Sequence, residues 1–187
     1  MNFDLKNKTA IVCGATQGIG FGIAQEFAKQ GVVLILIGRN KKKLKTCISS
    51  LNNPTKHSFI CVDFSSPDNL EKSLSNYFKK QKPIVHILIN NTGGPPSGLI
   101  EKAKTIEFTK AFNMHVLCNQ ILIKHVVPGM KKIKFGRIIN IISTSVKIPI
   151  KGLGVSNTIR GAVANWSKTL ANELGEFKIT VNNILPG

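Results

Sequence analysis

One stretch near the amino terminus constrains the fold most, because an apolar run, a glycine-rich turn and a helical pattern follow one another there. Thr9–Cys13 has the short, β-branched character of a strand, and apolar residues recur at helical spacing after the turn. Between them lie Gly14, Gly18 and Gly20. Glycine permits positive φ and close approach to the backbone, and a helix N-terminus offers free N–H groups to an anion. The stretch predicts a site for the pyrophosphate of a dinucleotide, with a purely structural tight turn as the alternative.

The rest of the chain alternates apolar runs with helical patterns from end to end. Strands are predicted at 32–37, 58–63, 84–89, 137–142 and 179–184, and helices at 41–51, 67–80, 106–130 and 155–174. No internal repeat, long linker or low-complexity segment interrupts this order. The alternation predicts an α/β fold with a doubly wound parallel sheet and right-handed crossovers, in one domain spanning residues 1–187.

Composition bears on the partners of the chain. The formal net charge is +17, but the lysines are scattered and only three arginines are present. Base readout usually relies on arginine and on stacking aromatic residues. The charge is therefore interpreted as solvated lysine faces, and a nucleic-acid partner is not expected.

Cysteine, histidine and apolar patterns bear on metals and on the compartment. The four cysteines form no CxxC pair and the four histidines no HExxH motif, so no metal site is predicted and buried free thiols are expected. The amino terminus lacks the apolar core of a signal peptide, and the longest apolar run, residues 32–37, is too short to span a bilayer. A soluble cytoplasmic protein with no membrane partner is expected.

The residue after the second predicted strand bears on the choice of dinucleotide. About twenty residues past such glycines, an acidic side chain commonly binds the ribose hydroxyl of NAD. This chain has Arg39 there, followed by the lysines of residues 41–43. Because a guanidinium pairs well with a 2′-phosphate, the sequence favours NADP (NADPH) over NAD. The alternative is that Arg39 only solvates a loop.

Several separated motifs then follow one another in a fixed order: Gly14-Ala15-Thr16-Gln17-Gly18-Ile19-Gly20, Asp63, Asn90-Asn91-Thr92-Gly93, Ser143, and the VNN that precedes Pro186-Gly187. In this order and spacing they resemble the short-chain dehydrogenase/reductase family, over essentially the whole chain. The resemblance implies a Rossmann-type sheet in the order 3-2-1-4-5-6 and a nicotinamide cofactor. It implies that Thr16, Gln17 and Ile19 line the phosphates and ribose, Asp63 and Phe64 the adenine, Asn91 the cofactor's ribose, and Pro186 and Gly187 the nicotinamide side. Gly93 belongs to the same cofactor-binding set.

The catalytic positions depart from the family's pattern. The family uses a serine, a tyrosine, a lysine four residues later, and an asparagine from the long helix before the serine-bearing strand. Ser143 matches the serine, but Ser156 stands in the tyrosine position, Arg160 in the lysine position and His115 in the asparagine position. The chain thus resembles a divergent branch. A serine alcohol is a far weaker acid than the phenol it replaces, whose pKa is about 10.

Two functions remain open from the sequence. In the first, the protein is an NADP(H)-dependent oxidoreductase acting on a small carbonyl or alcohol substrate. Ser143 polarises the carbonyl, Arg160 contacts the cofactor ribose and supplies charge, and His115 provides or relays the proton. In the second, it is a catalytically impaired dinucleotide-binding protein with a regulatory or assembly role. His115 then only fills its helix position.

The resemblance also bears on the carboxyl end and on assembly. Family members continue past the Pro-Gly pair into a substrate loop and a seventh strand, which this chain does not contain. The domain is therefore expected to be incomplete at its carboxyl end. Members usually pair through two long helices, here 106–130 and 155–174, so a homodimer or homotetramer is expected. Val163 and Trp166 are assigned either to that interface or to the core.

Overall fold

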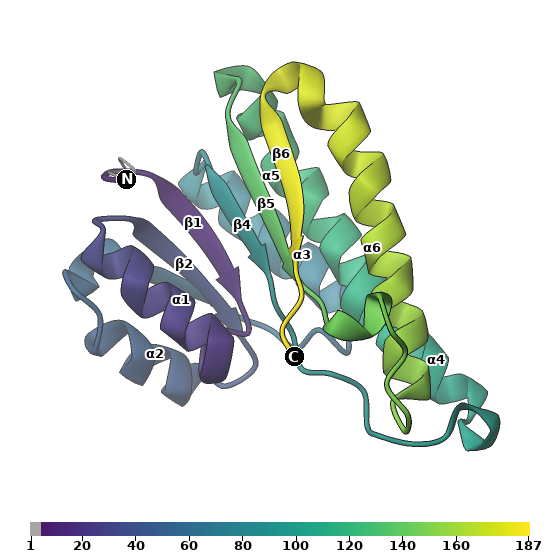
Figure 1. The fold of residues 1–187 in the computed structure, drawn as a ribbon. Coiled ribbons are helices and arrows are strands. Elements are labelled where there is room, and N and C mark those ends of the chain that lie inside the picture. Colours follow the sequence, from purple (N-terminus) through teal and green to yellow (C-terminus); the bar gives the residue numbers. More distant parts are fainter. Residues whose placement is uncertain (1–4) are drawn as a thin grey trace.

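A parallel six-stranded sheet forms the centre of the molecule, flanked by helices on both faces (Figure 1). The structure is a computed structural model that describes residues 5–187. The strands are β1 (Thr9–Cys13), β2 (Val33–Gly38), β3 (Ser58–Cys61), β4 (Ile87–Asn90), β5 (Gly136–Ile141) and β6 (Ile179–Ile184). They pair in the order β3-β2-β1-β4-β5-β6. The predicted Rossmann-type order is confirmed.

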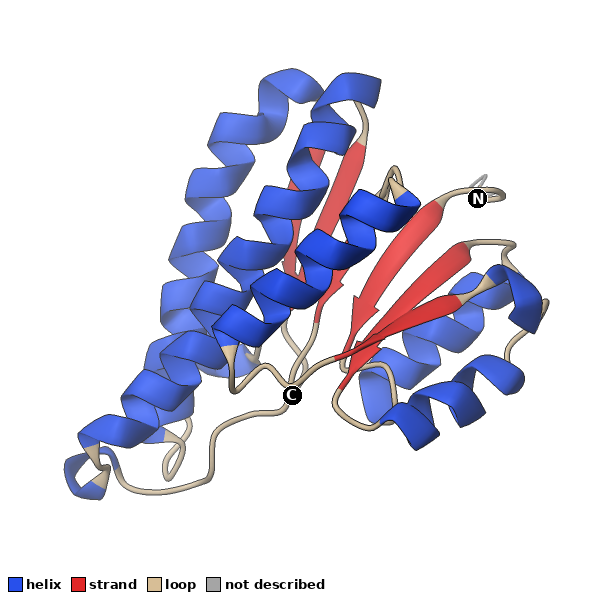
Figure 2. Ribbon diagram, turned by 180° about the vertical axis from the view of Figure 1, so that it is seen from behind, coloured by secondary structure: helices blue, strands red, loops and turns tan. Residues whose placement is uncertain are grey.

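The helices divide between the two faces of the sheet. On one face lie α1 (Gly18–Lys29) and α2 (Lys41–Ser49), and on the other α3 (Pro67–Gln81), α4 (Thr105–Phe112), α5 (Cys118–Ile133) and α6 (Gly154–Leu174), as Figures 1 and 2 show. Chain direction explains this division, because right-handed crossovers from β1 towards β3 and from β3 towards β6 fall on opposite faces. No helix within residues 5–187 combines the length and hydropathy needed to cross a membrane.

Alternating side chains of the central strands build a separate apolar core on each face. In β1, Ile11 and Cys13 belong to the core beneath α3, α5 and α6, whereas Ala10 and Val12 belong to the core beneath α1 and α2. Since both faces are covered, β1 and β2 have continuous apolar runs rather than an alternating pattern. Val163 of α6 is 2% exposed and thus lies in the interior, and the partly buried Trp166 donates from Nε1 to Gln120 Oε1 at 2.9 Å.

Three sequence expectations need correction. The predicted strand 84–89 begins only at Ile87, and Ile84 is 43% exposed, because the chain joins the sheet after the proline at 83. The glycines were expected within the turn, but α1 begins at Gly18, which places Gly18 and Gly20 in its first turn. Of the free cysteines, Cys61 is exposed rather than buried, since its side chain alternates outward on the edge strand β3.

The predicted helix 106–130 is interrupted. A π-helical turn over Asn113–Leu117 separates α4 from α5. Such a turn inserts one extra residue into the helix and is frequent at functional sites. His115 lies at its centre and is 2% exposed. The π-helical turn therefore changes the direction in which His115 points, and its side chain lies in the interior.

A buried polar ladder connects β4, β5, β6 and α6. Asn140 Oδ1 accepts a hydrogen bond from Asn90 Nδ2 at 2.8 Å, and Asn140 Nδ2 donates to Ser167 Oγ at 2.9 Å and to Asn183 Oδ1 at 3.1 Å. Ser167 Oγ lies 2.8 Å from Asn183 Oδ1. Because these side chains are shielded from water, each provides a hydrogen-bond partner for a polar group that would otherwise have none. The ladder fixes the carboxyl ends of three strands relative to α6.

We expect Asn140→Ala to lower the free energy of unfolding by about 3 kcal/mol, because it strands several buried polar groups. Urea denaturation monitored by far-UV circular dichroism measures the effect. Asn182→Ala is the matched control, since Asn182 is an exposed asparagine on β6, and its change should stay within about 0.5 kcal/mol. A loss below about 1 kcal/mol for Asn140→Ala would show that the ladder is not stabilising.

Candidate dinucleotide and catalytic site

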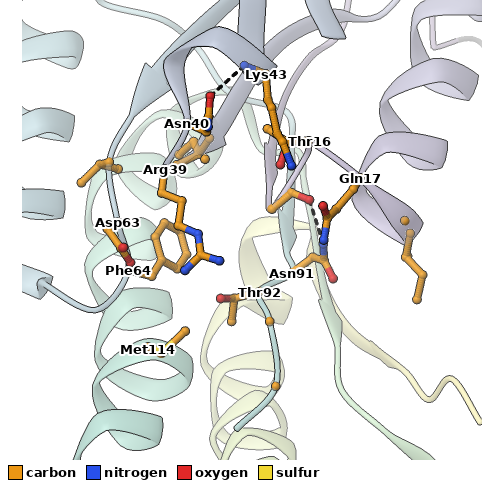
Figure 3. A pocket seen from close by; sticks show the side chains of 18 residues that line it. Thr16, Gln17, Arg39, Asn40, Lys43, Asp63, Phe64, Asn91, Thr92 and Met114 are labelled. Atoms are coloured by element: carbon orange, nitrogen blue, oxygen red, sulfur yellow. Dashed lines mark hydrogen bonds between the residues drawn. The ribbon is translucent and has the colours of Figure 1, made fainter. Parts of the chain in front are cut away.

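A groove of about 830 Å³ opens at the carboxyl edge of the sheet, where β1, β2, β3 and β4 end (Figure 3). Parallel sheets bind ligands at this edge, at the point where the strand order reverses between β1 and β4. Ten of the sequence-predicted cofactor residues line the groove: Gly14, Thr16, Gln17, Gly18, Ile19, Arg39, Asp63, Phe64, Asn91 and Gly93. Gly20, Arg160, Pro186 and Gly187 do not line it.

The glycine turn forms one end of the groove and is packed too closely for side chains. Gly14 has φ +60°, and a Cβ there would lie 2.6 Å from the Asn91 carbonyl oxygen. A Cβ on Gly20 would overlap the Gly14 carbonyl oxygen and lie 2.7 Å from Asn91 Nδ2. Gly18 has φ +55° and open space around it, so it is needed for its backbone conformation alone.

Asn91 holds this turn against the end of β4. Its Nδ2 donates to the carbonyl oxygens of Cys13 at 3.2 Å and Gly14 at 3.4 Å. The side-chain amide is therefore used to position the glycine turn, while the residue also lines the groove. The resemblance implied a ribose contact for Asn91, and its Oδ1 keeps acceptor capacity for one.

The β2–α2 turn supplies the positive charge of the groove. Arg39 and Lys43 extend into the groove from this turn (Figure 3), and both side chains are exposed. Asn40 caps α2, accepting from the Lys43 backbone N–H at 2.9 Å, and this cap fixes where the helix and its lysine begin. The cations lie where an acidic residue would bind the ribose of NAD.

The neighbouring part of the groove wall is formed by the residues that follow β3, the strand paired with β2. Phe64 is 7% exposed, and its carbonyl oxygen accepts from the Cys118 thiol at 3.3 Å. Asp63 is exposed, with Oδ1 accepting from the Ser65 N–H at 2.9 Å. An apolar ring edge beside a fixed carboxylate suits the flat face and amino group of an adenine.

Together these features test whether a nicotinamide dinucleotide fits the chain. A Cβ at Gly14 or Gly20 would fill the space that the glycine turn leaves open. The groove has the volume of a cofactor site, and Arg39 and Lys43 line it after β2. The residues present fit a nicotinamide dinucleotide. Beyond these ten residues and Lys43, seven further residues line the groove and had not been singled out as cofactor residues: Ile37, Gly38, Asn40, Val62, Thr92, Gly94 and Met114. Met114 gave no signal because it lies in the unforeseen π-helical turn.

Ser143 and Ser156 do not line the groove. Ser143 follows β5 and is half-buried, and its Oγ accepts from the Ser145 backbone N–H at 3.1 Å. Its hydroxyl hydrogen thus stays available to donate. Ser156 is half-buried in the first turn of α6. Pro186 reaches the same region, since its carbonyl oxygen accepts from the Thr144 N–H at 3.1 Å, and a Cβ on Gly187 would lie 4.0 Å from Thr144 Cγ2.

Arg160 is a buried cation anchored to the sheet. It is 8% exposed, and Nη1 donates to the Ile141 carbonyl oxygen at 2.8 Å. Burial lowers the pKa of its guanidinium below the usual range. A Cβ on Gly94 would lie 3.8 Å from Arg160 Nη2, so the outer edge of the guanidinium faces the segment after β4 that lines the groove.

His115 lies below that segment. Burial, with a smaller contribution from the charge of Arg160, lowers the pKa of the imidazole to about 3, and a hydrogen bond with the Gly93 backbone opposes this shift. The imidazole is therefore neutral near pH 7. A neutral, buried imidazole is poorly suited to deliver a proton to the substrate. This differs from the first function considered from the sequence, in which His115 provides or relays the proton.

Tyr77, the only tyrosine, is remote from this edge. Its hydroxyl lies 2.7 Å from Ser58 Oγ, and Ser58 is the first residue of β3, at the amino edge of the sheet. Tyr77 therefore lies too far from the groove to replace the missing tyrosine. No other phenol exists in the chain.

The parallel sheet, the glycine cradle and the groove at the strand-order reversal define a Rossmann-type nucleotide-binding domain. Residues 8–187 match the family described as short chain dehydrogenase, and the chain belongs to this family.

Individual relatives agree with this assignment. The chain is 31% identical to the 3-oxoacyl-[acyl-carrier-protein] reductase FabG of Chlamydia trachomatis over 188 residues, which cover 98% of this chain and 74% of that protein. It is 27% identical to the NADPH-dependent reductase BacG of Bacillus subtilis, covering 98% and 71% of the two chains. The crystal structure of L-sorbose reductase from Gluconobacter frateurii, complexed with NADPH and L-sorbose, superposes with a TM-score of 0.90 at 28% identity, covering 99% of this chain and 72% of that one.

Proposed function

We propose that the protein is an NADP(H)-dependent oxidoreductase that transfers a hydride between the nicotinamide and a small carbonyl or alcohol substrate. The observation that carries the choice of cofactor is the pair of cations, Arg39 and Lys43, in the groove where NAD-binding sites have an acid. The NADPH named in the descriptions of the Gluconobacter and Bacillus relatives supports the same choice.

Each residue has a role that its surroundings allow. The cofactor, when bound, supplies or accepts the hydride. The glycine turn would hold its pyrophosphate, and Arg39 with Lys43 its 2′-phosphate. Ser143 donates its hydroxyl to the substrate oxygen, since its Oγ already accepts from the Ser145 N–H. Arg160 places a fixed positive charge below the same region.

Proton delivery differs from that of the family's usual tyrosine. His115 is 2% exposed, whereas Ser143 and Ser156 are only half-buried. We therefore assign the proton to solvent that reaches the two serines, of which Ser156 occupies the sequence position of the missing tyrosine. A serine hydroxyl relays a proton less readily than a phenol, so turnover should be slow.

One observation favours the second candidate, a dinucleotide-binding protein without reductase activity. The chain has no phenol at the site, and Arg160 is held by Ile141 rather than free to act as the family's lysine does. Following NADPH oxidation with a broad carbonyl panel separates the two functions, with transfer of deuterium from labelled NADPH to product as proof of chemistry. Turnover supports the oxidoreductase; NADPH binding without transfer to any substrate supports the second candidate.

Restoring the family's pair tests how much the altered residues limit the reaction. We expect the double variant Ser156→Tyr with Arg160→Lys to reduce carbonyls at least tenfold faster than the unaltered protein, because a phenol is the better acid. The measurement is the rate of NADPH oxidation at saturating cofactor. A double variant that binds NADPH normally and reacts no faster would show that proton donation is not the limiting step.

Arg39→Ala should weaken NADPH binding about tenfold and change NADH binding less than twofold, because one exposed charge-assisted contact to the 2′-phosphate is lost. Titration of nicotinamide fluorescence gives both dissociation constants. Lys42→Ala is the matched control, as Lys42 is an exposed cation only three residues further along, at the start of α2, and does not line the groove. If both substitutions weaken NADPH binding equally, Arg39 acts only through the overall positive charge and makes no specific contact with the 2′-phosphate.

A further inference from the structure

A small cavity lies beneath the segment that follows β4, and Thr92 lines both this cavity and the groove. The cavity has about 10 Å³ available to the centre of a water molecule, which is the space of one. His115, Asn90 and Arg160 line it, together with Thr92, Asn119 and Asn140. Its walls therefore come from β4, β5, the π-helical turn, α5 and α6.

Three buried polar atoms of its lining have no hydrogen-bond partner within the described chain: His115 Nε2, Asn90 Oδ1 and Arg160 Nε. Their residues are 2%, 3% and 8% exposed. Buried polar groups are almost always paired, by protein or by ordered water. Three unpaired atoms around one water-sized space indicate a common partner.

The chemistry of the three atoms is complementary to one molecule. Arg160 Nε–H can only donate, and Asn90 Oδ1 can only accept, because Asn90 Nδ2 is the group that donates to Asn140. The hydrogen bond with the Gly93 backbone raises the pKa of His115, as expected where a ring N–H donates to a carbonyl. Since Nε2 is the ring nitrogen without a partner, Nδ1 carries that proton, and Nε2 is an acceptor.

We propose that a single buried water occupies this cavity and that, through it, His115 acts as a positioning residue for the Gly93–Gly94 segment of the groove. The water donates to His115 Nε2 and to Asn90 Oδ1 and accepts from Arg160 Nε–H. This fixes the imidazole as the Nδ1–H tautomer, which donates to Gly93. It also holds the guanidinium between Ile141 and the water, with Nη2 towards Gly94.

The water site is independent of whether the protein reduces a carbonyl, whereas its link to cofactor binding rests on the proposed function. Loss of the acceptor at His115 would release the water and leave Asn90 Oδ1 and Arg160 Nε without a partner. The Gly93–Gly94 segment would lose its support from below, although the glycine turn and Arg39 would be untouched. Dinucleotide affinity should then fall without loss of the preference for NADPH.

The tautomer and the water are tested directly, on the unaltered protein. A crystal structure at better than about 1.5 Å resolution should show one water within hydrogen-bond distance of all three atoms. Long-range ¹H–¹⁵N NMR at pH 7 should show His115 protonated at Nδ1 alone. A dry cavity, a direct His115–Arg160 contact or an Nε2–H tautomer would each overturn the proposal, whatever the fate of the proposed function.

The positioning role is tested by substitution. In His115→Leu the NADPH dissociation constant should rise about tenfold with the NADPH-to-NADH ratio unchanged, and His115→Asn, which restores an amide acceptor, should recover part of the loss. His125→Leu is the matched control, because His125 pairs with Glu71 on the α3–α5 surface and should bind NADPH as the unaltered protein does. If His115→Leu folds and binds NADPH normally, or if His115→Asn is as weak as His115→Leu, the positioning role is wrong.

Discussion

Gly20→Ala should reduce NADPH affinity about 100-fold. A Cβ at this position would overlap the Gly14 carbonyl oxygen and crowd Asn91 Nδ2. Both atoms belong to backbone or to a side chain fixed by two hydrogen bonds, so the turn itself must shift. Overpacking of this kind costs about 3 kcal/mol, which corresponds to about 100-fold in binding.

The comparison with Gly22→Ala makes this result specific. Gly22 lies two residues further along α1 and is exposed. A Cβ at Gly22 would have no atom within 4 Å. Alanine there should raise the free energy of unfolding by about 0.5–1 kcal/mol and leave NADPH binding unchanged. Thermal unfolding, followed beside each titration, separates lost binding from lost folding. If a folded Gly20→Ala protein binds NADPH normally, the glycine turn does not contact the cofactor.

Ser143→Ala should lower the rate of carbonyl reduction about 100-fold while changing the NADPH dissociation constant less than twofold. The hydroxyl is free to donate because its oxygen accepts from the Ser145 N–H, and loss of one such donor to a developing oxyanion typically costs 100-fold to 1,000-fold. Single-turnover rates at saturating NADPH measure the effect on chemistry alone.

Thr144→Val provides the control for this experiment. Thr144 follows Ser143 directly and is exposed, and its backbone rather than its hydroxyl bonds to Pro186. Its removal should leave the rate within about twofold, because no step uses that hydroxyl. If Ser143→Ala reduces carbonyls as fast as the unaltered protein, the substrate oxygen is stabilised elsewhere, and Arg160 becomes the remaining candidate.

The fold could be predicted from the sequence because each local signal agrees with the others. The apolar runs of β1 and β2 have no alternation, which only a sheet covered on both faces explains, and the alternation of elements fixes the direction of the crossovers. The groove could be predicted from two local signals. The glycines mark a turn by their backbone geometry, and Arg39 places a charge at a known distance after that turn.

The interior of the site could not be predicted in the same way. Nothing in residues 105–133 marks the π-helical turn, because one extra residue in a helix leaves the apolar spacing on either side intact. The burial of His115 and its low pKa follow from that turn and from Arg160, which is 45 positions away in the chain. A histidine that suits proton transfer at its ordinary pKa is thereby placed in surroundings that keep it neutral.

We expect this groove to bind NADP(H) in preference to NAD(H), through Arg39 and Lys43. The most direct measurement is a pair of fluorescence titrations of the unaltered protein with NADPH and with NADH, at the same ionic strength. NADPH should bind at least tenfold more tightly than NADH. NADH binding as tightly as NADPH, or more tightly, would contradict it.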